Sequence, residues 1–84
     1  MTEQQTEKLD LVFFNMGFIK QELQPEKHLI DDLGLDSLDV VELTMECEKA
    51  FKISIPDEEP GNISTYGEWV NMIEKYLPAE KKAA

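Results

Sequence analysis

One serine lies inside a group of aspartates in the segment DDLGLDSLDVVEL, residues 31–43, where a helix is expected to begin. Asp36 and Ser37 are both residue types that cap helix N-termini, so capping alone is one interpretation of this serine. A helix N-terminus also has free amide donors and a partial positive charge, which stabilise an attached phosphate. No histidine or lysine lies close in sequence to activate Ser37. It is therefore a poor catalytic nucleophile and a candidate attachment point for a phosphate ester.

Acidic side chains continue from this segment along the expected helix, and residues 31–48 contain neither Lys nor Arg. The acids are Asp31, Asp32, Asp36, Asp39, Glu42, Glu46 and Glu48. A solvated helix face is the ordinary explanation of such a run. The absence of bases, however, removes the ion pairs that often stabilise such a face. A face of a single sign also favours attraction of basic partners.

An acidic loop could instead bind calcium, which requires oxygen ligands at loop positions 1, 3 and 5, glycine at 6 and glutamate at 12. A loop starting at Asp32 has Gly34 at position 3 and Leu43 at position 12. A loop starting at Asp31 has Leu33 at position 3. The spacing fails in both cases, and no metal site is predicted.

Apolar periodicity predicts three main helices to position this segment. The first covers about residues 6–17, with Gly17 as its C-terminal stop. Its expected inner stripe is Leu9, Val12, Phe13 and Met16, widened by Leu11 and Phe14. The second begins at Asp36 or Ser37 and ends near Phe51. Its expected buried stripe is Val40, Leu43, Cys47 and Phe51. A neighbouring stripe of Leu38, Val41 and Met45 is more than a small helical packing needs, which indicates a face toward a partner or a pocket.

The third main helix begins at Ser64 or Thr65, because Thr65 and Glu68 fit a capping box, and Pro78 ends it. Its expected inner face is Tyr66, Val70, Ile73 and Leu77, widened by Trp69 and Tyr76.

Two connections complete the expected fold. Pro25 prevents a helix from running through that point of the long segment before Asp36, which must pack against the core through apolar anchors. The expected anchors are Phe18, Leu23, Leu29, Ile30 and Leu33. Asp57 is expected to cap one short helical turn, which Pro60 and Gly61 then limit. The prediction is an all-α fold, a small four-helix bundle of three main helices and one short third helix, with a long loop between helices one and two.

Composition restricts the class of protein. The 84 residues fit one domain, 1–84, with about 4–77 folded and 78–84 as a frayed tail. A net charge of −10, from 18 acids and 8 bases, disfavours nucleic acid as a partner and favours a monomer. The single cysteine permits no internal disulfide and disfavours a zinc cluster, and Cys47 is expected to be a small core hydrophobe. No apolar run is long enough for a membrane span, and the N-terminus is unlike a signal peptide. A cytoplasmic location is expected.

The central segment closely resembles the signature of the acyl carrier protein family, in which an acidic residue, Asp-Leu-Gly, a small or apolar residue and Asp-Ser-Leu precede an acidic helix. EKAFKISIPDEE and ISTYGEWVNMIEKYL are similar to later parts of the same family, so the resemblance covers most of the chain. It implies a free-standing carrier in which Ser37, beside Asp36, carries 4′-phosphopantetheine as a phosphodiester. A phosphopantetheinyl transferase would attach this arm from coenzyme A, and the arm's thiol would hold acyl groups as thioesters.

The resemblance also implies a partner-binding face on the second main helix. Its contact residues would be Asp36, Leu38, Asp39, Val41, Glu42, Met45 and Glu48, facing acyl-transferring and chain-elongating enzymes with basic docking patches. Service in fatty acid synthesis is the first expectation, and a specialised carrier of polyketide-like, D-alanyl or aminoacyl cargo is the alternative. A different class is an unmodified acidic adaptor that binds a basic protein. An enzyme is not predicted, because no acid, base and nucleophile set is assembled.

The chain departs from the family pattern at three places. The short third helix commonly continues with Ala-Glu-Lys, whereas this chain reads EEPGN, so Pro60 and Gly61 are expected to shorten it and to affect an acyl pocket between the second and third helices. The first helix, with Phe13 and Phe14, is more aromatic than usual, and core aromatic residues are candidates to line that pocket. The spacing from the first helix to DDLG is about a residue shorter. His28, without a visible ligand set, is expected to be structural or exposed.

Overall fold

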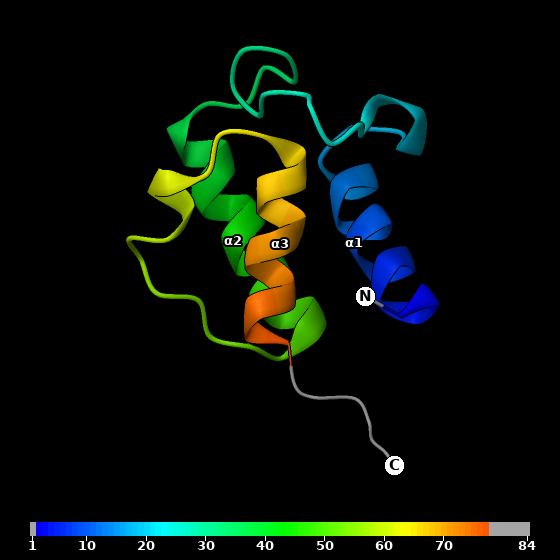
Figure 1. The fold of residues 1–84 in the computed structure, drawn as a ribbon, viewed down its shortest axis with the longest axis vertical. Helices are drawn as coiled ribbons and strands as arrows, with labels where there is room; N and C mark the ends of the chain where they lie inside the picture. The colour runs from blue at the N-terminus through cyan, green and yellow to red at the C-terminus, as the bar shows by residue number, and fades with distance from the viewer. Residues whose placement is uncertain (1, 78–84) are drawn as a thin grey trace.

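Three α-helices, α1 (Glu3–Asn15), α2 (Ser37–Phe51) and α3 (Tyr66–Tyr76), make up most of the protein in a computed structural model that describes residues 2–77. Two 3-10 turns, η1 (Lys20–Glu22) and η2 (Pro60–Asn62), lie in the connections. Figure 1 shows α3 in front of α2, α1 beside them, and the long connection from α1 crossing one end of the molecule. The described residues contain no strand, which confirms the all-α class. Pro78 and the expected tail lie outside the described residues.

Helix α1 begins three residues earlier than its apolar periodicity predicts. Thr2 and Gln5 form a capping box, in which the Gln5 N–H donates to Thr2 Oγ1 at 3.1 Å and the Thr2 N–H donates to Gln5 Oε1 at 2.9 Å. Residues 3–6 are polar and therefore contribute nothing to an apolar stripe. The cap, rather than the stripe, determines where this helix begins.

Only one face of α1 enters the core. Leu9, Val12 and Phe13 are buried, and Phe13 packs edge-to-face against Tyr66 of α3 with ring centroids 5.2 Å apart. The expectation that Leu11 and Phe14 widen the buried stripe is wrong, since they are 58% and 62% exposed. A helix at the edge of a small bundle has neighbours on one side only, so apolar residues beside the central stripe remain in solvent.

The buried stripe predicted for α2 is confirmed: Leu43, Cys47 and Phe51 are buried, and Val40 is half-buried. The capping box predicted for α3 is also present, with the Glu68 N–H donating to Thr65 Oγ1 at 3.2 Å. The inner face of α3 is rotated slightly from the expected one. Its buried residues are Tyr66, Trp69, Met72 and Ile73, whereas Val70, Tyr76 and Leu77 are half-buried.

The long connection from α1 to α2 is fastened to the start of α3 by backbone hydrogen bonds. Tyr66 N–H donates to Lys27 O at 2.8 Å, and Leu29 N–H donates to Ser64 O at 2.8 Å. Leu23 and Leu29 are buried, and Phe18 and Leu33 pack partly against the core, as predicted. Ile30 is not a core anchor, because it is 51% exposed.

The expected short third helix is a single 3-10 turn, η2, so a fourth helix is not confirmed. Asp57 does not cap it; the turn begins at Pro60 after Glu59, and no side chain caps it. Pro60 has no N–H with which to continue a helix from the preceding residues, and Gly61 is a weak helix former. The sequence EEPGN therefore supports one tight turn and no more.

Candidate functional site

Ser37 is the first residue of α2 and is exposed, but it does not cap the helix. The cap is Asp36, whose Oδ1 accepts from the Asp39 N–H at 2.9 Å, while Asp39 Oδ2 accepts from the Asp36 N–H at 3.2 Å. The interpretation of Ser37 as a capping residue is therefore wrong. Its hydroxyl makes no hydrogen bond within residues 2–77 and stands at the positive end of the helix dipole.

The turn before Asp36 depends on Gly34. This glycine has φ of +77° and donates its N–H to Ile30 O at 3.0 Å, and the next residue, Leu35, is buried. Leu35 N–H also donates to Leu29 O at 3.1 Å. The left-handed backbone at Gly34 thus turns the chain so that Leu35 enters the core and Asp36 begins α2.

Gly34→Ala is expected to lower the free energy of unfolding by about 1–2 kcal/mol, because an L side chain is strained in the left-handed region. A Cβ at Gly34 would meet no atom within 4 Å, so the cost is conformational rather than steric. Urea unfolding followed by circular dichroism measures it. Gly61→Ala is the matched control, since Gly61 also has open space and no positive φ. Equal losses in the two variants would contradict this account.

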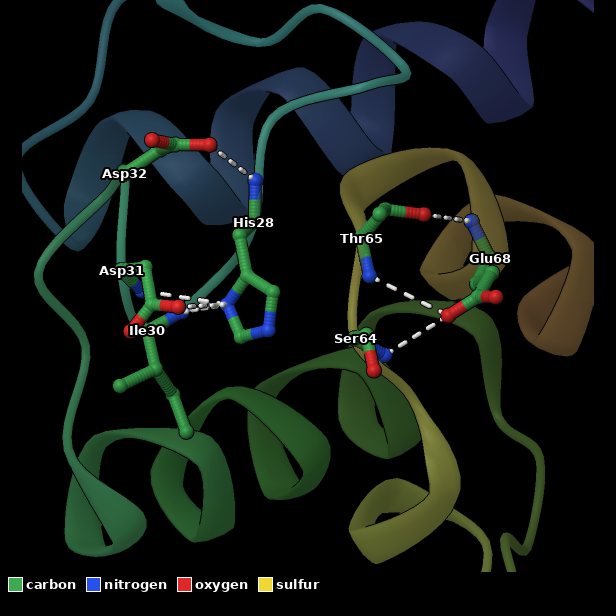
Figure 2. A network of polar contacts seen from close by, with 7 residues as sticks. All are labelled: His28, Ile30, Asp31, Asp32, Ser64, Thr65 and Glu68. Atoms are coloured by element: carbon green, nitrogen blue, oxygen red, sulfur yellow. Dashed lines mark hydrogen bonds and ion pairs between the residues drawn. The ribbon is translucent and has the colours of Figure 1, made fainter.

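His28 organises the loop that leads to the site, as Figure 2 shows. Its Nδ1 accepts from the Ile30 N–H at 3.2 Å and the Asp31 N–H at 3.1 Å, and Asp32 Oδ2 accepts from the His28 N–H at 2.8 Å. Because Nδ1 is an acceptor here, the imidazole carries its proton on Nε2. The expectation of a structural or exposed histidine therefore becomes a specific role, the capping of a turn.

A second capping network lies beside the first in Figure 2. Glu68 Oε1 accepts from the Ser64 N–H at 2.8 Å and the Thr65 N–H at 3.2 Å. These backbone bonds, first from Ser64 and then from Thr65, hold the pKa of the Glu68 carboxyl below its usual range. The two networks flank the hydrogen bond from Leu29 to Ser64 and so fasten the loop before Ser37 to the start of α3.

The residues predicted for partner binding on α2 fall into two groups. Leu38, Val41 and Met45 are large apolar side chains that are 76%, 56% and 56% exposed. Asp36 and Glu42 are exposed beside them. Asp39 and Glu48 are half-buried, and each accepts a backbone hydrogen bond. Asp39 Oδ2 accepts from the Asp36 N–H at 3.2 Å, and Glu48 Oε2 accepts from the Ile55 N–H at 2.8 Å. This internal role of Glu48 has no local sequence signal, because its partner lies seven residues away in a loop.

A cavity of about 620 Å³ lies between α2 and the segment that carries η2. Its lining is Leu29, Ile30, Ser37, Val40, Val41, Thr44, Met45, Glu48, Asp57, Pro60, Gly61 and Ile63. Most of these side chains are apolar, and Ser37 is one of the residues that line the cavity. The aromatic residues suggested for such a pocket do not line it; Phe13 and Trp69 lie in the core instead.

Residues 2–77 offer neither a metal site nor a membrane-spanning helix. Their His, Cys, Asp and Glu side chains form no group of three that could hold a metal ion. None of their helices is both long and apolar enough to span a membrane.

Comparison with known proteins supplies the family. Residues 15–73 match the family described as "Phosphopantetheine attachment site". An acyl carrier protein of Chlorobium phaeobacteroides is 44% identical over 77 residues, which are 89% of this chain and 99% of that protein. One from Syntrophobacter fumaroxidans is 45% identical over 80 residues, 95% of this chain and 93% of its own. One from Clostridium acetobutylicum is 43% identical over 67 residues, 80% and 87% of the two chains. With its helical fold and a phosphopantetheine-attachment domain over most of its length, the chain belongs to the acyl carrier protein family.

Proposed function

We propose that Ser37 is the residue to which 4′-phosphopantetheine is attached. The observation that supports this most is its position: an exposed, unbonded hydroxyl at the first residue of α2, beside an apolar cavity. The reciprocal bonds of Asp36 and Asp39 fix the helix start without using the serine. A transferase can therefore approach the hydroxyl without disturbing the cap.

The residues around Ser37 fit a phosphodiester. Asp36 engages the amide of Asp39, and the Val40 N–H donates to Asp36 O at 3.0 Å. The N–H groups of Ser37 and Leu38 have no partner within the helix, as is usual for the first turn, and are available to a phosphate oxygen. When bound, the arm supplies a thiol that holds acyl groups as thioesters; the protein supplies attachment, orientation and shelter.

We assign the cavity to the acyl chain, because its wall is mainly apolar and Ser37 lies on it. Service to fatty acid synthesis enzymes is the first proposal for the pathway, and the protein acts as their cofactor-bearing substrate rather than as an enzyme. A specialised carrier is the second candidate, since η2 replaces the longer helix that the resemblance leads one to expect. A rise in melting temperature with the length of a saturated acyl chain on the arm would support fatty cargo over aminoacyl cargo.

The single buried cysteine fits a reducing, cytoplasmic setting.

Incubation with coenzyme A and a broad-specificity phosphopantetheinyl transferase tests the attachment directly. Intact mass spectrometry is expected to show one added phosphopantetheine on the wild type and none on Ser37→Ala. A known carrier protein in the same tube shows that the transferase is active. If only that carrier gains mass while this protein is folded, the unmodified adaptor becomes the better interpretation.

Glu42→Lys is expected to weaken binding of the transferase by about tenfold at low salt and much less at high salt, because reversing an exposed charge acts through screened attraction. Titration of the fluorescently labelled variant at the two salt concentrations measures this. Glu7→Lys makes the same charge change on an exposed position of α1 and is the control. Equal losses of affinity for the transferase in Glu42→Lys and Glu7→Lys would contradict a docking role for α2.

A further inference from the structure

The outer wall of the cavity is the segment that carries η2, and this wall has little regular structure of its own. Pro60, Gly61 and Ile63 line the cavity from this side, opposite residues of α2. Within the turn, Asn62 N–H donates to Glu59 O at 3.0 Å, and Ile63 N–H donates to Pro60 O at 3.2 Å. Two backbone bonds within one turn give a short segment little intrinsic stability. Its position must therefore depend on contacts to the helices.

The wall is fastened to a helix at each end. Near α2, Glu48 accepts from the backbone of Ile55, whose side chain is buried. Near α3, a single oxygen of Glu59 accepts from Lys75 Nζ at 2.8 Å and from Tyr76 Oη–H at 2.6 Å. We call Glu59, Lys75 and Tyr76 the clasp. None of the three lines the cavity, yet Glu59 directly precedes Pro60.

The chemistry of the clasp favours a defined geometry. Both bonds to Glu59 are charge-assisted, which makes them shorter and stronger than neutral ones. The bonds from Lys75 and then Tyr76 hold the pKa of the Glu59 carboxyl below its usual range, and the bond to Glu59 raises the pKa of both Lys75 and Tyr76. The Lys75 ammonium also lies 5.4 Å from the centroid of the Tyr76 ring. The Glu59 side chain is only 22% exposed, so this residue of the clasp lies against the protein surface.

We propose that Glu59 is the positioning residue of the cavity wall: through Lys75 and Tyr76 it holds η2 against the helices and so determines how well the cavity shelters an acyl chain. This inference rests on the proposed carrier function and adds to it the residues that regulate access to the cargo. The clasp substitutes for the helical hydrogen bonding that Pro60 prevents and that Gly61 disfavours. Residues outside the cavity then determine how long the wall stays closed.

Amide hydrogen exchange on the unmodified protein tests the first half of the proposal. Glu59→Ala, which removes both bonds, is expected to speed exchange at Asn62 and Ile63 by about two- to fivefold, the range for losing an exposed charged pair. Tyr76→Phe should give a smaller rise, and Glu59→Gln, which retains an acceptor, should recover part of the loss. Glu58→Ala removes the neighbouring exposed carboxylate and should leave both amides unchanged. Equal rates in Glu59→Ala and Glu58→Ala would overturn the proposal.

Cleavage of the thioester by hydroxylamine tests the second half, on protein carrying the arm. An octanoyl group is long enough to occupy the cavity, whereas an acetyl group is not. Glu59→Ala should speed cleavage of the octanoyl thioester by about two- to fivefold and leave the acetyl thioester unchanged. Faster exchange without faster octanoyl cleavage would show that the wall does not shelter cargo and would overturn the proposal. If Ser37 accepts no arm, intact mass shows that the carrier function has failed, and the exchange rates still decide whether the clasp holds η2.

Discussion

Cys47 is expected to react with iodoacetamide about a thousandfold more slowly than an exposed thiol at pH 8, because only the thiolate reacts. The side chain is fully buried, and burial raises the pKa of its thiol from 9.0 to about 12. The Trp69 indole lowers the pKa of this thiol by a smaller amount than burial raises it. The indole N–H has no hydrogen-bond partner within residues 2–77. A difference of three between the two pKa values lowers the thiolate fraction by a factor of about 1,000.

Mass spectrometry of alkylated protein, native and in urea, measures this protection. Rapid labelling of the native protein, at a rate close to that in urea, would contradict the buried position.

The burial of Cys47 also makes the free energy of unfolding depend on pH. A folded-state pKa above the unfolded one stabilises the protein fully below pH 9, and this stabilisation is lost as the pH rises toward 12. At pH 10 the loss from this thiol is about 1.4 kcal/mol, which Cys47→Ala should abolish.

Trp69→Ala is expected to lower the free energy of unfolding by about 4 kcal/mol, the usual cost of removing a fully buried aromatic side chain. Trp69 is the largest side chain in the core and is 0% exposed. For a domain of this size the melting temperature should fall by about 20 °C. Because total stability in such domains is about 4–12 kcal/mol, this single substitution removes a third or more of it.

Trp69→Phe separates the effect of lost side-chain volume from the effect of the unpaired indole N–H. It keeps an aromatic ring in place and removes the buried N–H that lacks a hydrogen-bond partner. We expect a loss of about 1–2 kcal/mol, because relief of an unsatisfied donor offsets part of the lost volume. Thermal unfolding followed by far-ultraviolet circular dichroism compares the variants, since the single tryptophan is the residue replaced. A loss below 1 kcal/mol in Trp69→Ala would mean that the core closes around the gap.

Local sequence signals were sufficient to predict the two helices that carry the site. The stripe from Val40 to Phe51 and the acidic start at Asp36 predict α2, and Thr65 with Glu68 predicts the start of α3. Such signals depend on residues within one or two turns, which a sequence shows directly. The central segment also resembles the family's signature closely enough to make Ser37 the candidate for the attachment site.

Depth of burial and long-range contacts could not be predicted in the same way. Periodicity marks Phe14 and Ile30 as apolar but does not tell which neighbours cover them, and both are exposed. The bond from Tyr76 to Glu59 joins residues 17 positions apart, and only the fold brings them together. His28 acts through its ring nitrogen on two backbone amides, a contact that depends on the local turn. These features depend on the tertiary fold and leave no periodic pattern in the sequence.

The reciprocal cap formed by Asp36 and Asp39 bears on the attachment proposed at Ser37. The two carboxylates fix the first turn of α2 through backbone amides, and neither bond involves the Ser37 hydroxyl. Under the proposed function, adding or removing an arm at this hydroxyl would therefore break no hydrogen bond of the cap. A single polypeptide could then pass through many rounds of loading and release without refolding.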